Sequence, residues 1–133
     1  MPRASGTFDV KLSPQPADDY ADGAMLSRLT IDKTFRGDLA ATSRGQMLAA
    51  GTAVRGSAGY VAIELVTGSL AGRAGSFVLQ HSGTMRRDAP TLALAVVPDS
   101  GTGELTGVSG TMAITITNGA HSYDLEYSLA DPT

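Results

Sequence analysis

Apolar and polar residues alternate along much of the chain, with the period of two that is typical of half-buried β-strands. Near the start, Phe8, Val10 and Leu12 alternate with polar neighbours. Stretches rich in glycine, proline and aspartate separate the alternating segments and indicate turns. The pattern predicts eight strands, over residues 7–12, 25–36, 39–50, 60–70, 76–84, 92–97, 104–117 and 121–129. The third segment also permits a helix, because Ala, Met, Leu and Gln are common in it.

The last two strands form a predicted hairpin whose register can be tested on the sequence. The Asn-Gly pair at 118–119 favours a two-residue type I′ turn, in which both central residues take positive φ. Pairing Thr117 with Ala120 across this turn brings the apolar residues of both strands onto one face and the polar residues onto the other. The same register places Tyr127 opposite Gly110, where the ring can cover bare backbone.

Short connections between eight strands, with no convincing helix, predict an all-β fold. We expect residues 1–133 to form a single domain, an eight-stranded antiparallel up-and-down β-barrel. Closing the sheet on itself removes the exposed strand edges that it would otherwise carry. The interior of an eight-stranded barrel can be filled by side chains, or it can hold one small ligand.

One pair of polar side chains falls on the apolar face of the hairpin formed by residues 60–85. If Gly72–Gly75 is the turn, Glu64 pairs with Gly83 and His81 becomes its diagonal neighbour, within side-chain reach. A carboxylate beside an imidazole can hold a polar group of a ligand or carry out general acid–base chemistry. Alternatively, the two side chains satisfy each other inside the barrel, or a one-residue slip turns both to solvent.

The candidate ligand-binding residues are therefore Glu64, His81, Tyr60, Tyr123 and Tyr127. The alternative for the three tyrosines is a core aromatic ring with a hydrogen-bonded hydroxyl. Lys33 also falls on an apolar strand face, but a lysine near a strand end usually reaches solvent through its flexible stem. We therefore expect Lys33 to be exposed and leave it outside the candidate site.

Composition excludes several classes of function. The net charge is −3 and the ten basic residues are scattered, which argues against a nucleic-acid partner. The absence of cysteine excludes disulfides and thiolate catalysis. No apolar run is long enough to span a membrane, so a cytoplasmic protein without a membrane partner is expected. His81 and His121 are a weak basis for a metal site, so no metal or cofactor is predicted.

Aliphatic side chains also fall on the outside of the predicted barrel. Val61, Ile63, Leu65 and Val78 share the outward face of the 60–85 hairpin. Aliphatic rows exposed on adjacent strands are typical of subunit interfaces. This pattern predicts a homo-oligomer.

Two segments resemble a known family. They are TGSLAGRAGSFVLQHSGTM at 67–85 and VVPDSGTGELTGVSGTMAI at 96–114. They resemble a bacterial family of unknown function whose fold is similar to the allene oxide cyclase barrel, and the likeness runs over residues 6–129. Within the second segment, SGTGELTGVSG also resembles the glycine-patterned strand shared by allene oxide cyclases and dirigent proteins.

The resemblance implies an eight-stranded barrel, often oligomeric in the cyclases, and no established activity. The catalytic constellation of the cyclases includes a cysteine, which this chain lacks, so their reaction is not carried over. The leading functional prediction is a barrel that binds a small, largely apolar molecule in its interior. The alternatives are an isomerase or cyclase-type enzyme that uses Glu64 and His81 as acid and base, and a structural or interaction protein with a filled barrel.

Overall fold

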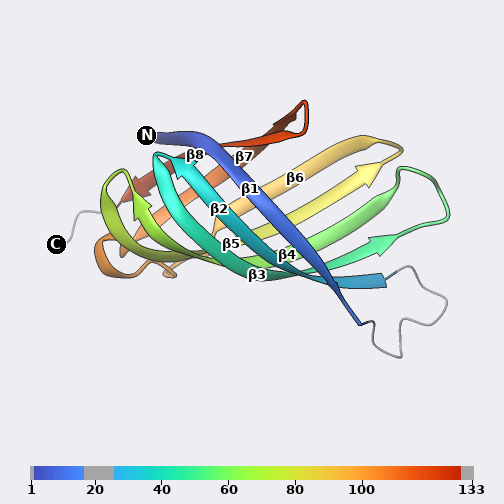
Figure 1. Cartoon of the computed structure of the whole chain (residues 1–133), viewed down its shortest axis with the longest axis horizontal. Coiled ribbons are helices and arrows are strands. Elements are labelled where there is room, and N and C mark those ends of the chain that lie inside the picture. The colour runs from blue at the N-terminus through green and yellow to red at the C-terminus, as the bar shows by residue number, and fades with distance from the viewer. Residues whose placement is uncertain (1, 17–25, 130–133) are drawn as a thin grey trace.

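The protein is a closed antiparallel β-barrel in which each strand pairs with the next and the last pairs with the first (Figure 1). The computed structural model describes residues 2–16 and 26–129. The strands are β1 (Arg3–Gln15), β2 (Leu26–Gly37), β3 (Leu39–Gly51), β4 (Ala58–Leu70), β5 (Arg73–Arg86), β6 (Ala89–Val96), β7 (Val108–Thr117) and β8 (Ala120–Leu129). The predicted all-β barrel is confirmed, and the ambiguous third segment is a strand.

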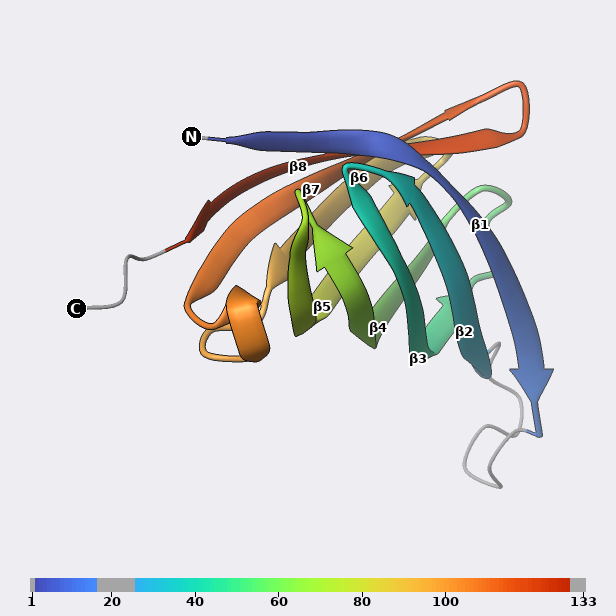
Figure 2. The same ribbon diagram turned by 60° about the vertical axis from the view of Figure 1, so that its left-hand side comes forward.

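One predicted strand starts too early. The segment expected to be extended from Glu104 begins instead with a short 3₁₀ helix, η2 (Gly103–Leu105), and β7 starts at Val108. The side chain of Leu105 is 1 % exposed. Thus η2 closes one end of the barrel with an apolar side chain (Figure 2).

The β7–β8 hairpin has the predicted register. Thr117 pairs with Ala120 and Gly110 with Tyr127, and all the pairs between them follow. Asn118 and Gly119 have φ angles of 52° and 80°, as a type I′ turn requires. The agreement arises because turn chemistry and the alternation of apolar residues specify the same pairing.

The predicted turn of the β4–β5 hairpin is wrong. The turn consists of Ala71 and Gly72, with φ angles of 50° and 84°, and Leu70 pairs directly with Arg73. The other glycine of the expected turn, Gly75, lies within β5, where a Cβ would collide with the backbone of Thr102. A glycine needed for close packing was therefore misinterpreted as a turn glycine.

This correction moves the pairing by an even number of residues, so the faces of both strands are unchanged. Glu64 pairs with Leu79, and His81 pairs with Ala62. The two polar residues thus stay diagonal neighbours on the inner face, as predicted, with a different partner opposite each.

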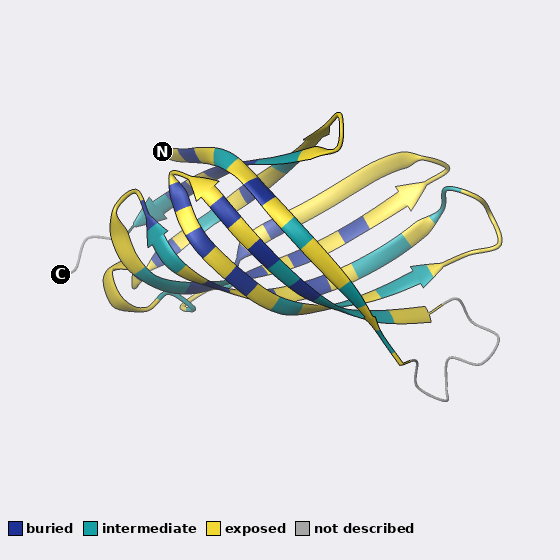
Figure 3. Cartoon of the chain, viewed as in Figure 1, coloured by how far each residue is buried: buried dark blue, intermediate teal, exposed yellow. Residues whose placement is uncertain are grey.

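The interior differs between the two ends of the barrel. Toward η2 it is filled by a single apolar cluster, and buried residues alternate with exposed ones along the strands (Figure 3). Toward the opposite end, inward positions carry small residues such as Ala49, Ala58 and Gly83, and exposed residues predominate. One half of the barrel is therefore packed, and the other half is left hollow.

The seam between β6 and β7 is the weakest in the sheet. Within the described residues it contains one pair, Ala95 with Thr111, whereas β5 and β6 form eight. Beyond this pair the two strands diverge toward the β7–β8 turn (Figures 1 and 2). The part of the chain that the structure describes contains no helix long and apolar enough to cross a membrane.

Candidate functional site

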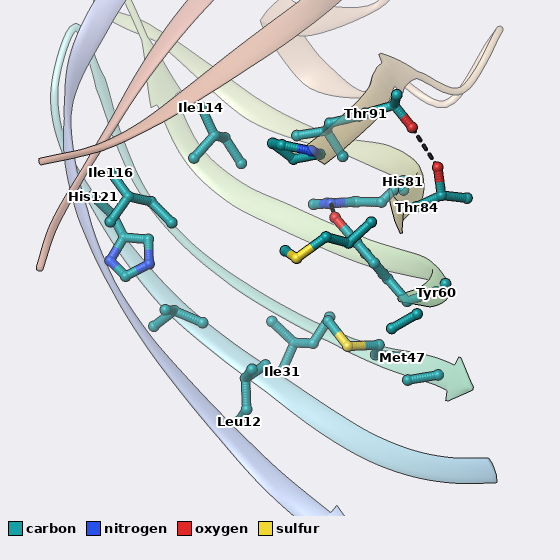
Figure 4. A pocket seen from close by; sticks show the side chains of 18 of the residues that line it. Leu12, Ile31, Met47, Tyr60, His81, Thr84, Thr91, Ile114, Ile116 and His121 are labelled. Carbon is teal, nitrogen blue, oxygen red and sulfur yellow. Dashed lines mark hydrogen bonds between the residues drawn. The ribbon is translucent and has the colours of Figure 1, made fainter. Parts of the chain in front are cut away.

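The hollow half of the barrel forms a cavity of about 730 Å³. This volume lies in the range of small-molecule sites. Its walls are mainly aliphatic, and at its rim Leu12, Met85, Leu92 and Ile116 are 41–64 % exposed. Figure 4 shows Leu12, Ile31, Met47, Ile114 and Ile116 around this space. The cavity is therefore an apolar cup that opens at the end of the barrel opposite η2.

A buried polar cluster forms the floor of the cup. The carboxylate of Glu64 is fully buried and accepts hydrogen bonds from three side chains. His81 Nε2 lies 2.6 Å from Oε2, Lys33 Nζ lies 2.9 Å from the same oxygen, and Ser43 Oγ lies 2.9 Å from Oε1. Both oxygens have partners within the protein, and because Glu64 is fully buried and absent from the cavity wall, it presents no acceptor to the cavity.

Three neighbouring strands hold this carboxylate in place. Glu64 on β4 lies opposite Gly45 of β3, and a Cβ at Gly45 would collide with Glu64. The glycine thus allows the Glu64 backbone and side chain to pack closely against β3. Ser43 on β3 and Lys33 on β2 are paired with each other. Their side chains therefore reach Glu64 from adjacent strands.

The environment of Glu64 favours its ionised form. Burial alone raises the pKa of a carboxyl group, but hydrogen bonds from His81 and Lys33, together with the charge of Lys33, more than offset this effect. The pKa of Glu64 therefore lies below its ordinary value. Near neutral pH the residue is a fixed negative charge that orients its partners.

The expectation that Lys33 reaches solvent is wrong. Lys33 lies in the middle of β2 and is 7 % exposed. Its ammonium group forms an ion pair with Glu64 and lies 5.0 Å from the ring centre of Phe8 and 5.7 Å from that of Phe35. An opposite charge and two aromatic faces compensate for its desolvation. Lys33 lines the cavity, so it belongs to the site.

Tyr60 and His81 point toward one another at the cavity wall (Figure 4). The Tyr60 hydroxyl lies 3.5 Å from His81 Nδ1, while Nε2 faces Glu64. When the ring is neutral and Nε2 donates to Glu64, Nδ1 is left as an acceptor for the Tyr60 hydroxyl. Burial first, and the charge of Glu64 second, raise the pKa of Tyr60, so its hydroxyl stays protonated and can donate.

The other two candidate tyrosines lie in the packed half of the barrel. Tyr123 and Tyr127 belong to the apolar cluster and are absent from the cavity wall. The Tyr123 hydroxyl accepts a hydrogen bond from the backbone N–H of Leu39 and lies 2.8 Å from the carbonyl oxygen of Arg36, to which it donates. It thus secures the β2–β3 turn, so Tyr123 is a core aromatic ring with a hydrogen-bonded hydroxyl.

His121 lies on the cavity wall, away from the polar floor. Its ring centre is 5.1 Å from that of Phe8. In the part of the chain that the structure describes, no group of three or more His, Asp or Glu side chains is arranged to hold a metal ion. At the floor of the cup, the lining residues with polar side-chain atoms are Lys33, His81 and Tyr60.

Comparison with known proteins identifies the family. The family described as "Protein of unknown function (DUF3224)" matches residues 4–127. The chain belongs to the DUF3224 family. A crystal structure of a DUF3224 protein of unknown function from Shewanella oneidensis MR-1 is 54% identical, covers 99% of both chains and has a TM-score of 0.94. No match was found among the curated proteins.

Two members of the polar floor, Lys33 and Ser43, were missed at the level of sequence. Lys33 lies two residues from Ile31 and from Phe35 on the same strand, so the alternation placed it on their inward face. A lysine can be buried there only when a carboxylate compensates its charge, and that carboxylate, Glu64, is 31 residues away in the sequence on another strand. Ser43 lies in the segment that also permitted a helix, so its face could not be assigned.

Proposed function

We propose that this DUF3224 protein binds a small, largely apolar molecule in the hollow half of its barrel. The observation that supports this most strongly is the apolar cup of about 730 Å³ beside a packed half. Small residues at inward positions keep the cup open, while a polar floor supplies a few fixed donors. Apolar walls with a few placed polar groups are typical of ligand sites.

A titration with the neutral fluorescent probe N-phenyl-1-naphthylamine tests this proposal. We expect saturable fluorescence enhancement with the wild-type protein, because the probe gains an apolar environment. Ala49→Trp should weaken it, because the indole ring occupies part of the cup. Ala40→Trp, the same change on the outer face of β3, should leave it intact. Binding that is equal in the two variants, or absent in the wild type, would contradict the proposal.

A second candidate function, an isomerase that acts through acid–base chemistry, is favoured by one specific arrangement. Tyr60, His81 and Glu64 form a chain of hydroxyl, imidazole and carboxylate. In this arrangement His81 or Tyr60 would exchange a proton with the substrate, and Glu64 would only orient the imidazole. Turnover of a bound molecule that is lost in His81→Gln but kept in His121→Gln would favour this function over binding alone.

The outer surface supports a proposed homo-oligomer. Val61, Ile63 and Leu65 are each about half exposed on β4, and Val78 on β5 is partly exposed beside Leu65. We expect light scattering to give a mass above that of one chain, and Ile63→Lys to lower it. A wild-type monomer at micromolar concentration would contradict this prediction. The cytoplasmic location stays a prediction.

A further inference from the structure

The polar floor of the cup presents hydrogen-bond donors to a ligand. Lys33 Nζ carries three N–H groups, and its one hydrogen bond within the described residues goes to Glu64. Its other two donors have no hydrogen-bond partner within the described residues, and Lys33 lines the cavity. The Tyr60 hydroxyl becomes a further donor when His81 Nδ1 carries a proton, whereas Glu64 is fully buried and does not line the cavity. A ligand that reaches the floor thus meets donors and a positive charge.

The charge balance of the floor restricts how an anion can bind. Lys33 and Glu64 neutralise each other, so an added anion would leave one uncompensated negative charge in a buried site. In the described structure, the titratable groups near His81 are Glu64 and Tyr60 on β4 and Lys33 on β2. The residue opposite His81 on β6 is Leu94, which is apolar. From β3, the hydroxyl of Ser43 binds Glu64. An imidazole can gain one positive charge near neutral pH.

Given the proposed binding function, we infer that the natural ligand is an amphipathic acid, an apolar body with one anionic head. The head binds Lys33 at the floor of the cup, and His81 takes up one proton as the complex forms. Protonated His81 donates through both ring nitrogens, to Glu64 through Nε2 and to the Tyr60 hydroxyl through Nδ1, so the Tyr60 proton is free to be donated to the head. The floor then holds two positive and two negative charges. Glu64 acts as a positioning residue because it does not contact the ligand.

Two matched probes test this inference, 1-decanesulfonate and 1-decanol, which have the same apolar chain. Each is used to displace N-phenyl-1-naphthylamine from the wild-type protein between about pH 6 and pH 8. The sulfonate stays ionised over this range, so any proton taken up goes to the protein. We expect the sulfonate to bind more tightly than the alcohol. Its affinity should fall by up to about tenfold for each unit rise in pH, while that of the alcohol stays constant.

Calorimetry on the wild-type protein, in two buffers with different ionisation enthalpies, measures the proton uptake directly and needs no variant. We expect about one proton for each sulfonate bound and none for the alcohol. His81→Gln keeps a donor for Glu64 but cannot gain a proton, so it should remove the pH dependence. His121→Gln is the matched control on the same cavity wall and should retain it.

The outcomes separate this inference from the proposed function. If the fluorescent probe binds but sulfonate and alcohol compete equally at every pH, the acidic-ligand inference is overturned and the apolar cup stands. Proton uptake that persists in His81→Gln would overturn the assignment of the proton to His81. If the fluorescent probe does not bind at all, the proposed function fails, and this inference fails with it.

Discussion

At the scale of single residues, Lys33 and Glu64 form a buried ion pair in the polar floor of the cup. Removing one partner of a buried pair leaves the other charge desolvated without compensation. We expect Lys33→Met to lower the free energy of unfolding by about 3 kcal/mol, because His81 and Ser43 still donate to Glu64. Urea denaturation measures this loss.

The chain contains a matched control for that substitution. Arg44 and Asp32 form an ion pair on the outer surface, where the arginine side chain is 89% exposed. Arg44→Met should change stability very little, because solvent already screens the pair. Equal effects of the two substitutions would mean that burial does not set the strength of the Lys33–Glu64 contact.

The lowered pKa of Glu64 predicts how stability depends on pH. The unfolded chain takes up a proton at this residue at a higher pH than the folded protein does, so acid favours unfolding. We expect the stability contributed by Glu64 to be intact near neutral pH and to be lost progressively below about pH 5. Unfolding curves at a series of pH values should show a weaker acid dependence for Glu64→Gln than for the wild type. An unchanged acid dependence would contradict this prediction.

At the scale of secondary-structure elements, the two hairpin turns offer a direct comparison. Ala71 has a φ of 50°, in the left-handed region where a Cβ is strained, whereas the equivalent position of the β7–β8 turn is Asn118. We expect Ala71→Asn to raise the free energy of unfolding by about 1 kcal/mol. The reverse change, Asn118→Ala, should lower it by a similar amount. A loss of stability in Ala71→Asn, or a gain in Asn118→Ala, would contradict the turn assignment.

The β6–β7 seam predicts where the barrel opens most readily. Along residues 89–94, β6 has backbone partners on β5 but none on β7 within the described structure, whereas β4 is paired on both sides. Hydrogen exchange should therefore be faster in peptides covering residues 89–94 than in peptides covering residues 60–66. Equal protection of the two segments would show that the seam is closed in solution.

At the scale of the whole molecule, the barrel and its inward faces could be predicted because alternation fixes which side chains point inward. The β7–β8 register followed for the same reason, since the Asn-Gly turn and the apolar pattern agree. The β4–β5 turn could not be located because Gly75 is required by contact with Thr102, which belongs to a distant segment. The error shifted the predicted pairing by an even number of residues, so Glu64 and His81 were still placed on the same inner face as neighbours.

The extent of the cavity could not be read from the sequence. A filled and a hollow barrel share the same alternation, and the difference depends on the volumes of residues that come together from several strands, such as Ala49, Ala58 and Gly83. The same limitation concealed the polar floor. Lys33, Ser43 and Glu64 lie on three strands, and their contacts exist only once the sheet has closed.

A crystal structure of the protein in complex with 1-decanesulfonate tests the central claim most directly. We predict that the alkyl chain lies in the apolar cup and that a sulfonate oxygen lies within about 3.2 Å of Lys33 Nζ. His81 Nε2 should retain its contact with Glu64 in the complex. A sulfonate at the rim, or a ligand bound on the outer face of the barrel, would contradict the account.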